Sequence, residues 1–89
     1  MIVGVPKEIK NHEYRVGLTP ESVSELVSRG HGTIIEANAG LGIGATDDLY
    51  LAAGAEVVST AEEVYARADM IVKVKEPQAV ERKMLRPGQ

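Results

Sequence analysis

The sequence contains no cysteine, no tryptophan and no phenylalanine, and only three tyrosines among its 89 residues. Without cysteine, disulfides, thiolate metal sites and cysteine nucleophiles are all excluded. Because aromatic side chains are scarce, the hydrophobic core has to be built from Val, Ile, Leu, Ala and Met. A chain of this length suffices for one small domain, which buries roughly two-thirds of the surface that its unfolded state exposes.

Long hydrophobic runs and an excess of basic charge are missing as well. No apolar stretch approaches the roughly 20 residues that span a bilayer, and the opening segment Met1–Glu8 lacks the basic region and long apolar run of a signal peptide. The formal net charge is −3, and no cluster of Lys and Arg indicates a nucleic-acid partner. We therefore expect a cytoplasmic protein that binds neither membranes nor nucleic acid.

Strand and helix signals alternate along the chain. Short apolar runs predict strands, and residues that cap helices predict where helices begin. Thr19 and Pro20 have the residue types preferred at the start of a helix, and Thr60 with Glu63 matches a capping box. The expected strands are Ile2–Val5, Thr33–Glu36, Glu56–Val58 and Met70–Lys75, and the expected helices begin at Pro20, Thr46, Thr60 and Gln78, the last of them extending to Leu85.

This alternation predicts an α/β fold, a Rossmann-like parallel sheet of about four strands with flanking helices. The closing segment Leu85–Gln89 has the composition of a turn leading to another strand. We therefore expect residues 1–89 to be the N-terminal part of a larger domain, with an incomplete sheet.

Two basic residues are expected to converge at one edge of this sheet. Ligands of open parallel sheets bind beyond the carboxyl ends of the strands. Arg15 lies in the loop after the first expected strand, and Lys75 ends the fourth. A guanidinium can hold a carboxylate through two parallel hydrogen bonds, and a lysine adds a point charge, so the pair would suit a small carboxylic acid with a second oxygen. On these grounds alone, solvated surface charge is the commoner role for both residues.

Other charged residues near this edge are expected to be solvent-exposed. Lys73 shares a strand face with Lys75, and its ammonium is expected to reach solvent. Glu8, Glu13 and Glu76 flank the expected crevice. Each could pair with one of the two basic residues, but an exposed loop carboxylate is the more common arrangement.

The glycine-rich loop predicts a structural turn. Gly40, Gly42 and Gly44 are spaced G-x-G-x-G after the second expected strand, and two aspartates, Asp47 and Asp48, follow. A dinucleotide site requires G-x-G-x-x-G between a strand and the helix that holds the pyrophosphate, and the aspartates would repel that anion.

Neither histidine indicates a metal site. His12 and His31 have no partner ligand at metal-binding spacing. A surface or turn position is expected for both, and no metal is expected in this chain.

At the level of motifs, the sequence resembles the alanine dehydrogenases. The motifs are Val3-Gly4-Val5-Pro6-Lys7-Glu8, then Glu13-Tyr14-Arg15-Val16, and later Val72-Lys73-Val74-Lys75-Glu76-Pro77. The resemblance covers essentially the whole chain. In looser form, the same opening begins the nucleotide-binding subunit of proton-translocating NAD(P) transhydrogenases.

The resemblance implies an NAD-dependent enzyme, homo-oligomeric at full length, that reversibly deaminates L-alanine to pyruvate and ammonia. In this family, the arginine of Glu-x-Arg-Val holds the substrate carboxylate and the lysine before Glu-Pro polarises the substrate carbonyl. By motif these residues are Arg15 and Lys75. The family's acid/base histidine and its NAD-binding domain are expected beyond Gln89. No catalytic and no cofactor-binding residue is therefore expected here, and the chain alone is expected to be inactive.

Two further interpretations stay open. The chain could be the N-terminal part of the alpha subunit of an NAD(P) transhydrogenase, in which hydride passes between nucleotides and no amino acid binds. It could also be a non-catalytic interaction fragment that docks through an unpaired sheet edge. The segment Lys7–Asn11, with Arg15 and Lys75, favours alanine dehydrogenase.

Overall fold

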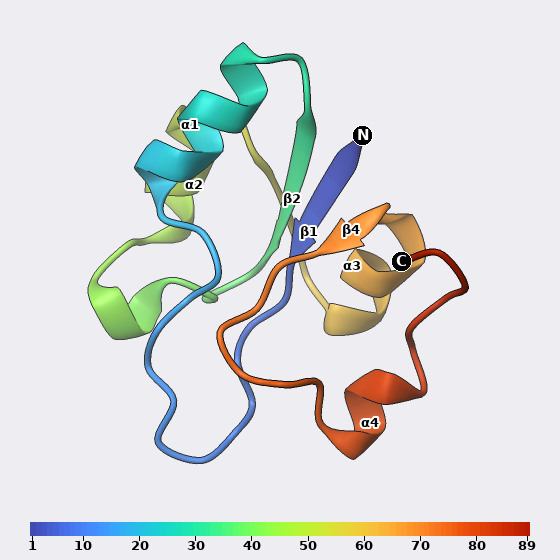
Figure 1. Cartoon of the computed structure of the whole chain (residues 1–89). Coiled ribbons are helices and arrows are strands. Elements are labelled where there is room, and N and C mark those ends of the chain that lie inside the picture. Colours follow the sequence, from blue (N-terminus) through green and yellow to red (C-terminus); the bar gives the residue numbers. More distant parts are fainter.

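A four-stranded parallel sheet forms the centre of the molecule (Figure 1). The computed structural model describes all residues, 1–89. The strands are β1 (Ile2–Val5), β2 (Gly32–Glu36), β3 (Glu56–Val58) and β4 (Met70–Ile71), and their spatial order is β3-β2-β1-β4. Every pair in the sheet is parallel. The predicted α/β class and the parallel sheet of four strands are therefore confirmed.

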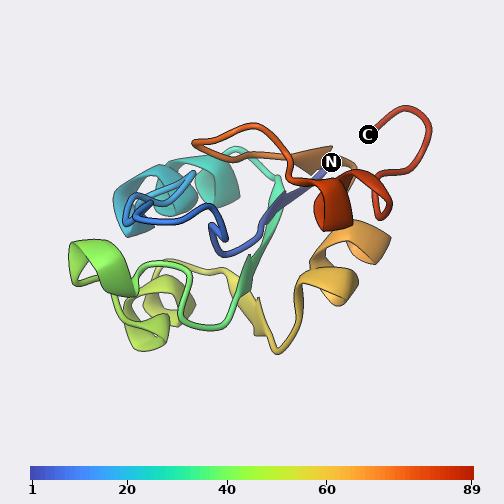
Figure 2. The same ribbon diagram turned by 90° about the horizontal axis from the view of Figure 1, so that it is seen from below.

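Helices cover both faces of the sheet. They are α1 (Pro20–Ser28), α2 (Asp47–Ala52), α3 (Ala61–Arg67) and α4 (Ala79–Arg82), with a short 3₁₀ helix, η1, at Leu41–Ile43. Seen from below, α1 and α2 lie on one side of the strands and α3 on the other (Figure 2). No helix combines the length and the hydrophobicity needed to cross a membrane.

The core is split by the sheet into two clusters, and the buried side chains of Tyr50 and Tyr65 correct the expectation of a core without aromatic residues. Successive strand residues point to opposite faces, so Ile35 packs towards α1 and α2 while Ile34 packs towards α3. The first cluster also contains Val5, Val23, Ala39, Ala45, Tyr50 and Ala55, and the second contains Val58, Val64 and Ala68.

Helices α1 and α3 begin where the capping residues predict. Thr19 Oγ1 accepts the N–H of Ser22 at 3.3 Å, and Thr60 Oγ1 accepts that of Glu63 at the same distance. These bonds satisfy amide groups that have no partner within the helix. The Glu63 carboxylate pairs with Arg67 at 3.1 Å.

Gly4 allows α3 to approach β1 closely. A Cβ atom at this position would lie 2.6 Å from Cβ of Ala68 and 2.8 Å from Cγ1 of Val64. Both distances are too short for carbon atoms, so a glycine is required where the helix crosses the strand.

The fourth strand is shorter than predicted, which corrects the expected range Met70–Lys75. The Val72 N–H still donates to the Gly4 carbonyl at 3.0 Å. Beyond that residue, the N–H groups of Val74 and Lys75 donate to the Glu8 side chain at 3.1 and 3.2 Å. Because a side chain satisfies these amides, the strand ladder is not continued.

The last helix is also shorter than predicted, since α4 ends at Arg82 and not at Leu85. The N–H of Met84 donates to the carbonyl of Glu81, and that of Leu85 to Arg82. These bonds span three residues, so the chain after Arg82 forms tighter turns than an α-helix.

Candidate functional site

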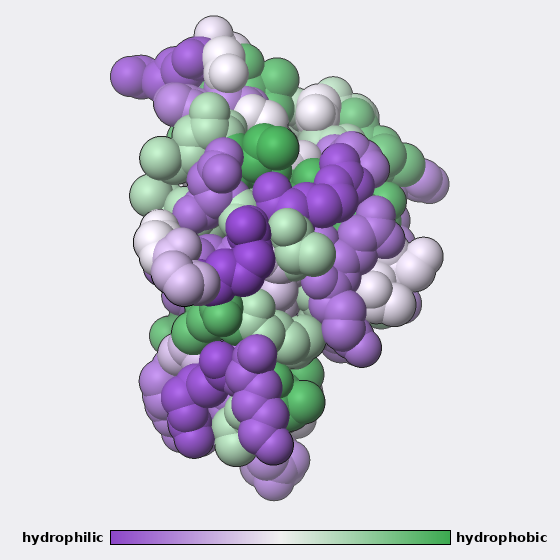
Figure 3. All heavy atoms as spheres, turned by 90° about the vertical axis from the view of Figure 1, so that its right-hand side faces the viewer, coloured by the Kyte–Doolittle hydropathy of each residue, from purple (hydrophilic) through white to green (hydrophobic).

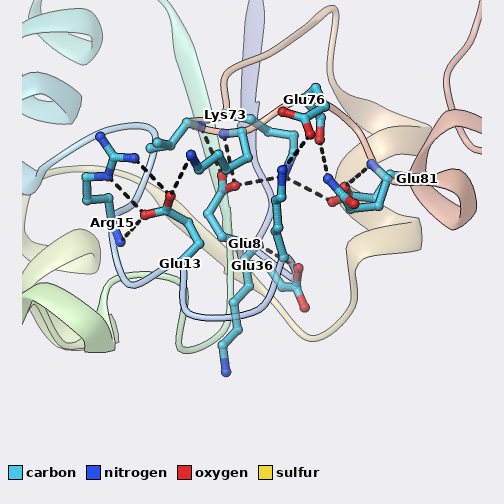
Figure 4. A network of polar contacts seen from close by, with 12 residues as sticks. Glu8, Glu13, Arg15, Glu36, Lys73, Glu76 and Glu81 are labelled. Carbon is cyan, nitrogen blue, oxygen red and sulfur yellow. Dashed lines mark hydrogen bonds and ion pairs between the residues drawn. The ribbon is translucent and has the colours of Figure 1, made fainter.

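Arg15 and Lys75 meet at one carboxylate, that of Glu13. Figure 4 shows the pair that Glu13 forms with Arg15. Arg15 donates from Nε to Oε2 of Glu13 at 3.0 Å and from Nη2 to Oε1 at 2.9 Å. The Nζ atom of Lys75 lies 3.9 Å from the same Oε1. The structure thus brings together the two basic residues selected from the sequence, although sixty positions separate them, and an acidic side chain bridges them.

Glu13 is folded inward, and the expectation of an exposed loop carboxylate is wrong for this residue. Its side chain is 5% exposed, whereas that of Arg15 is 65% exposed and that of Lys75 39%. The backbone N–H of Arg15 also donates to Glu13, at 2.9 Å. The hydrogen bonds from the Arg15 side chain, and then its backbone, lower the pKa of Glu13 from 4.5 to about 2, because they stabilise the ionised form.

The two basic residues open onto different hollows. Arg15 lines a hollow of about 270 Å³ together with Lys7, Glu8, Glu13, Tyr14, Asn38, Ala39, Leu41 and Gly42. Lys75 lines a groove of about 730 Å³ that runs along β4 to the C-terminal residues. Figure 3 shows the side of the molecule on which β4 and the C-terminus lie, where hydrophobic residues form separate patches among hydrophilic ones.

The glycine-rich loop braces the segment that carries Arg15. A Cβ atom at Gly42 would collide with the carbonyl oxygen of Tyr14, so the loop packs directly against the backbone beside Arg15. Gly44 has φ +77°, a conformation that glycine adopts readily. The predicted structural turn is therefore confirmed.

The same loop does not fit a dinucleotide phosphate. Asp47, the first residue of α2, accepts the N–H of Asn38 at 2.9 Å through its carboxylate. The acidic group thus occupies the start of a helix of six residues, where an anion would have to bind.

A buried group of three charged side chains, Glu8, Lys73 and Glu81, lies next to Lys75. The Nζ atom of Lys73 is 3.1 Å from Oε1 of Glu8 and 3.2 Å from Oε2 of Glu81. The side chains are 6%, 2% and 1% exposed for Lys73, Glu8 and Glu81. The predictions that Lys73 and Glu8 are solvent-exposed are wrong. Their opposite charges pair with each other, which allows both side chains to be buried.

The sequence contains no local signal for this group. Lys73 and Glu8 are 65 positions apart, and the helix that carries Glu81 lies on yet another segment. Glu81 also accepts the N–H of Gln78 at 2.9 Å, which closes the first turn of α4. Of these contacts, only the bond between Gln78 and Glu81 can be predicted from the sequence, because the spacing of the two residues matches a capping box.

The Tyr65 hydroxyl belongs to the same interior region. It is buried close to the Glu81 carboxylate and makes no hydrogen bond of ordinary geometry. Burial, and then the negative charge of Glu81, raise the pKa of Tyr65.

The remaining expectations concern Glu76 and the two histidines. Glu76 is exposed as predicted, with a side chain 65% exposed, and pairs with Lys10 at 2.9 Å. This hydrogen bond lowers the pKa of Glu76 from 4.5 to about 2. His12 occupies the predicted turn with φ +62°, and His31 is partly buried just before β2. No three His, Asp or Glu side chains are grouped so that they could hold a metal ion.

Comparison with known proteins identifies the family. Residues 4–89 match the family described as alanine dehydrogenase/PNT, N-terminal domain. The chain is 53% identical to an alanine dehydrogenase of Methanococcus maripaludis, over all of this chain and 24% of that protein. It is 50% identical to the alanine dehydrogenase of Bacillus subtilis, over 99% of this chain and 23% of that one.

Solved structures agree. An L-alanine dehydrogenase matches with a TM-score of 0.93 and 51% identity, over 97% of this chain and 24% of that one. A transhydrogenase from Sinorhizobium meliloti matches with a TM-score of 0.91 and 42% identity, over 99% of this chain and 25% of that one. The chain spans about a quarter of the length of these relatives. Because the match extends over nearly every residue, the chain belongs to the alanine dehydrogenase/PNT N-terminal domain family.

Proposed function

We propose that this chain supplies part of the substrate pocket of an alanine dehydrogenase. In this proposal Arg15 holds the carboxylate of L-alanine or pyruvate, and Lys75 contacts the second oxygen of pyruvate. The observation that carries the proposal is the shared carboxylate of Glu13, which contacts both basic side chains. The names of the relatives support it too, and identity is 51% with the L-alanine dehydrogenase structure against 42% with the transhydrogenase.

The arrangement suits an anionic ligand. Two cations and one anion, Arg15, Lys75 and Glu13, leave one positive charge in the group. A guanidinium carries more N–H donors than the two that Glu13 engages, and the Arg15 side chain is 65% exposed. Donors therefore remain for a substrate carboxylate.

Glu13 also orients both cations before a substrate arrives. The paired hydrogen bonds to Arg15 fix the plane of its guanidinium, so less conformational entropy is lost on binding. The ammonium of Lys75 would stabilise negative charge that develops on the substrate oxygen.

For the whole protein we propose reversible oxidative deamination of L-alanine to pyruvate and ammonia with NAD, in a cytoplasmic homo-oligomer. The residues of this chain do not fit NAD, because the glycine loop places Asp47 where a phosphate would bind. We assign no cofactor-binding residue and no acid/base residue to these 89 positions. We expect no NADH oxidation when pyruvate and ammonia are added to the chain alone, and saturable NADH loss would contradict this.

The substrate role is tested by titrating the isotope-labelled chain with pyruvate and following the Arg15 and Lys75 side-chain NMR signals. We expect saturable shifts of both groups, lost in Arg15→Ala. Arg29→Ala is the matched control, since Arg29 pairs with Glu25 at 2.8 Å on the exposed surface of α1. A folded chain that shows no shift at millimolar pyruvate would contradict the proposal.

The transhydrogenase interpretation is the second candidate, supported by the TM-score of 0.91 with the Sinorhizobium meliloti structure. The same titration separates the two. A chain that responds to pyruvate but not to acetate favours the amino-acid enzyme, because only pyruvate offers Lys75 a keto oxygen in addition to its carboxylate. An equal response to both anions would favour the alternative.

A further inference from the structure

We propose that Glu8 is a positioning residue for Lys75. This inference rests on the proposed function, in which Lys75 contacts the substrate. The Glu8 carboxylate makes no hydrogen bond with the Lys75 ammonium. It accepts the backbone N–H of Lys75 and so acts on the main chain that carries this side chain.

The Glu8 carboxylate holds the segment after β4 by three donors. Its Oε1 accepts the backbone N–H of Lys75 at 3.2 Å and the ammonium of Lys73 at 3.1 Å, and its Oε2 accepts the N–H of Val74 at 3.1 Å. Figure 4 shows Glu8 at the centre of this network, between the pair Glu13–Arg15 and Glu81. Because both oxygens are engaged and the side chain is 2% exposed, its position is closely defined.

This contact replaces the strand ladder at the point where β4 ends. The last main-chain bond between β1 and the segment after β4 is the one from Val72 N to Gly4 O, at 3.0 Å. The next amides, of Val74 and Lys75, are held by a side chain from the loop that follows β1. That same loop carries Arg15, so Glu8 sets the spacing between the two proposed substrate-binding residues.

Lys73 and Glu81 keep the Glu8 carboxylate in the interior. One ammonium lies between two carboxylates, and a buried charge is stable only when it is paired and hydrogen-bonded. Removing the charge of Glu8 leaves Lys73 paired with Glu81. The substitution Glu8→Gln therefore preserves a neutral pair and the shape of the side chain, and we expect this variant to fold.

The first arm of the test needs no ligand. Glutamine has one carbonyl oxygen and an amide that donates, so it cannot accept all three N–H groups. We expect the amide protons of Val74 and Lys75 to be protected from exchange in the unmodified chain, and at least one of them to exchange roughly tenfold faster in Glu8→Gln. Glu76→Gln, an exposed carboxylate in the same segment, is the matched control and should leave both rates unchanged.

The second arm is a double-mutant cycle on pyruvate affinity with Glu8→Gln, Lys75→Ala and the combination. We expect Glu8→Gln to weaken binding roughly tenfold, since small displacements of a binding group are costly. In the Lys75→Ala background we expect no further loss, because Glu8 acts through Lys75. Equal losses in both backgrounds would indicate a general structural role and overturn the inference.

The two arms separate the inference from the proposed function. An unmodified chain that is folded but does not bind pyruvate contradicts the proposed function. The amide exchange rates then test by themselves whether Glu8 holds the backbone of Lys75. Loss of protection confined to the variant supports that hold. Rapid exchange of both amides in the unmodified chain overturns it, even when the variant itself fails to fold.

Discussion

The ammonium of Lys73 lies 3.1 Å from the carboxylate of Glu8, and both side chains are almost completely buried. The ion pair joins the loop after β1 to the segment after β4 (Figure 4). These two segments carry Arg15 and Lys75. The interior ion pair therefore links the stability of the domain to the geometry of the proposed substrate pocket.

Lys73→Met should strongly destabilise the domain. The substitution leaves the carboxylates of Glu8 and Glu81 buried without a cation, which costs about 3–5 kcal/mol in comparable cases. Urea unfolding measures the change. Lys10→Met is the control, because the pair Lys10–Glu76 is exposed and such pairs contribute little. Similar unfolding midpoints for the two variants would contradict the burial of Lys73.

Glu13 should titrate far below an ordinary glutamate. Its folded-state pKa of about 2 lies below the ordinary value of 4.5, so its ionised form stabilises the folded chain. This contribution is complete above about pH 4.5 and is lost as the pH falls through about 2. The ¹³C shift of the Glu13 carboxyl carbon against pH reports the value.

In Arg15→Ala we expect the pKa of Glu13 to rise towards 4.5, since Arg15 is the main cause of the shift. Glu76 is the internal control, because its low pKa depends on Lys10 and should not move. A Glu13 midpoint near 4.5 in the unmodified chain would show that the Glu13–Arg15 pair does not persist in solution.

Gly4→Ala should destabilise the domain, whereas Gly32→Ala should not. An added Cβ at Gly4 meets Ala68 at 2.6 Å, while one at Gly32 meets only Cγ1 of Ile2, at 3.6 Å. Overpacking of this kind costs about 1–3 kcal/mol. Thermal unfolding of both variants checks the prediction, and an equal effect of the two substitutions would rule out close packing of α3 on β1.

Tyr50→Phe and Tyr65→Phe should have different effects although both side chains are buried. The Tyr50 hydroxyl donates to the Leu18 carbonyl at 2.7 Å, and its loss should cost about 1 kcal/mol. The Tyr65 hydroxyl makes no hydrogen bond of ordinary geometry, so its removal should be neutral or stabilising. Urea unfolding of the pair tests this, and a larger loss for Tyr65→Phe would reveal a partner for that hydroxyl.

Local patterns determined most of the fold. The apolar run Ile2–Val5 and the cap at Thr19 predict β1 and the start of α1 correctly, because strand burial and helix capping depend on neighbouring residues. The alternation of such elements then specifies a parallel sheet. The range Met70–Lys75 was wrong for β4, since its end depends on a side chain contributed by a distant loop.

The site divides in the same way. Sequence motifs selected Arg15 and Lys75, and the parallel topology explains why the loops that carry them lie at the same edge. Only the tertiary structure placed Glu13 between them and buried Glu8, Lys73 and Glu81. From the sequence, a charged residue is predicted to be exposed when none of its neighbours along the chain can pair with it. The burial of these three is decided by pairing across the fold, which compensates the cost of removing each charge from water.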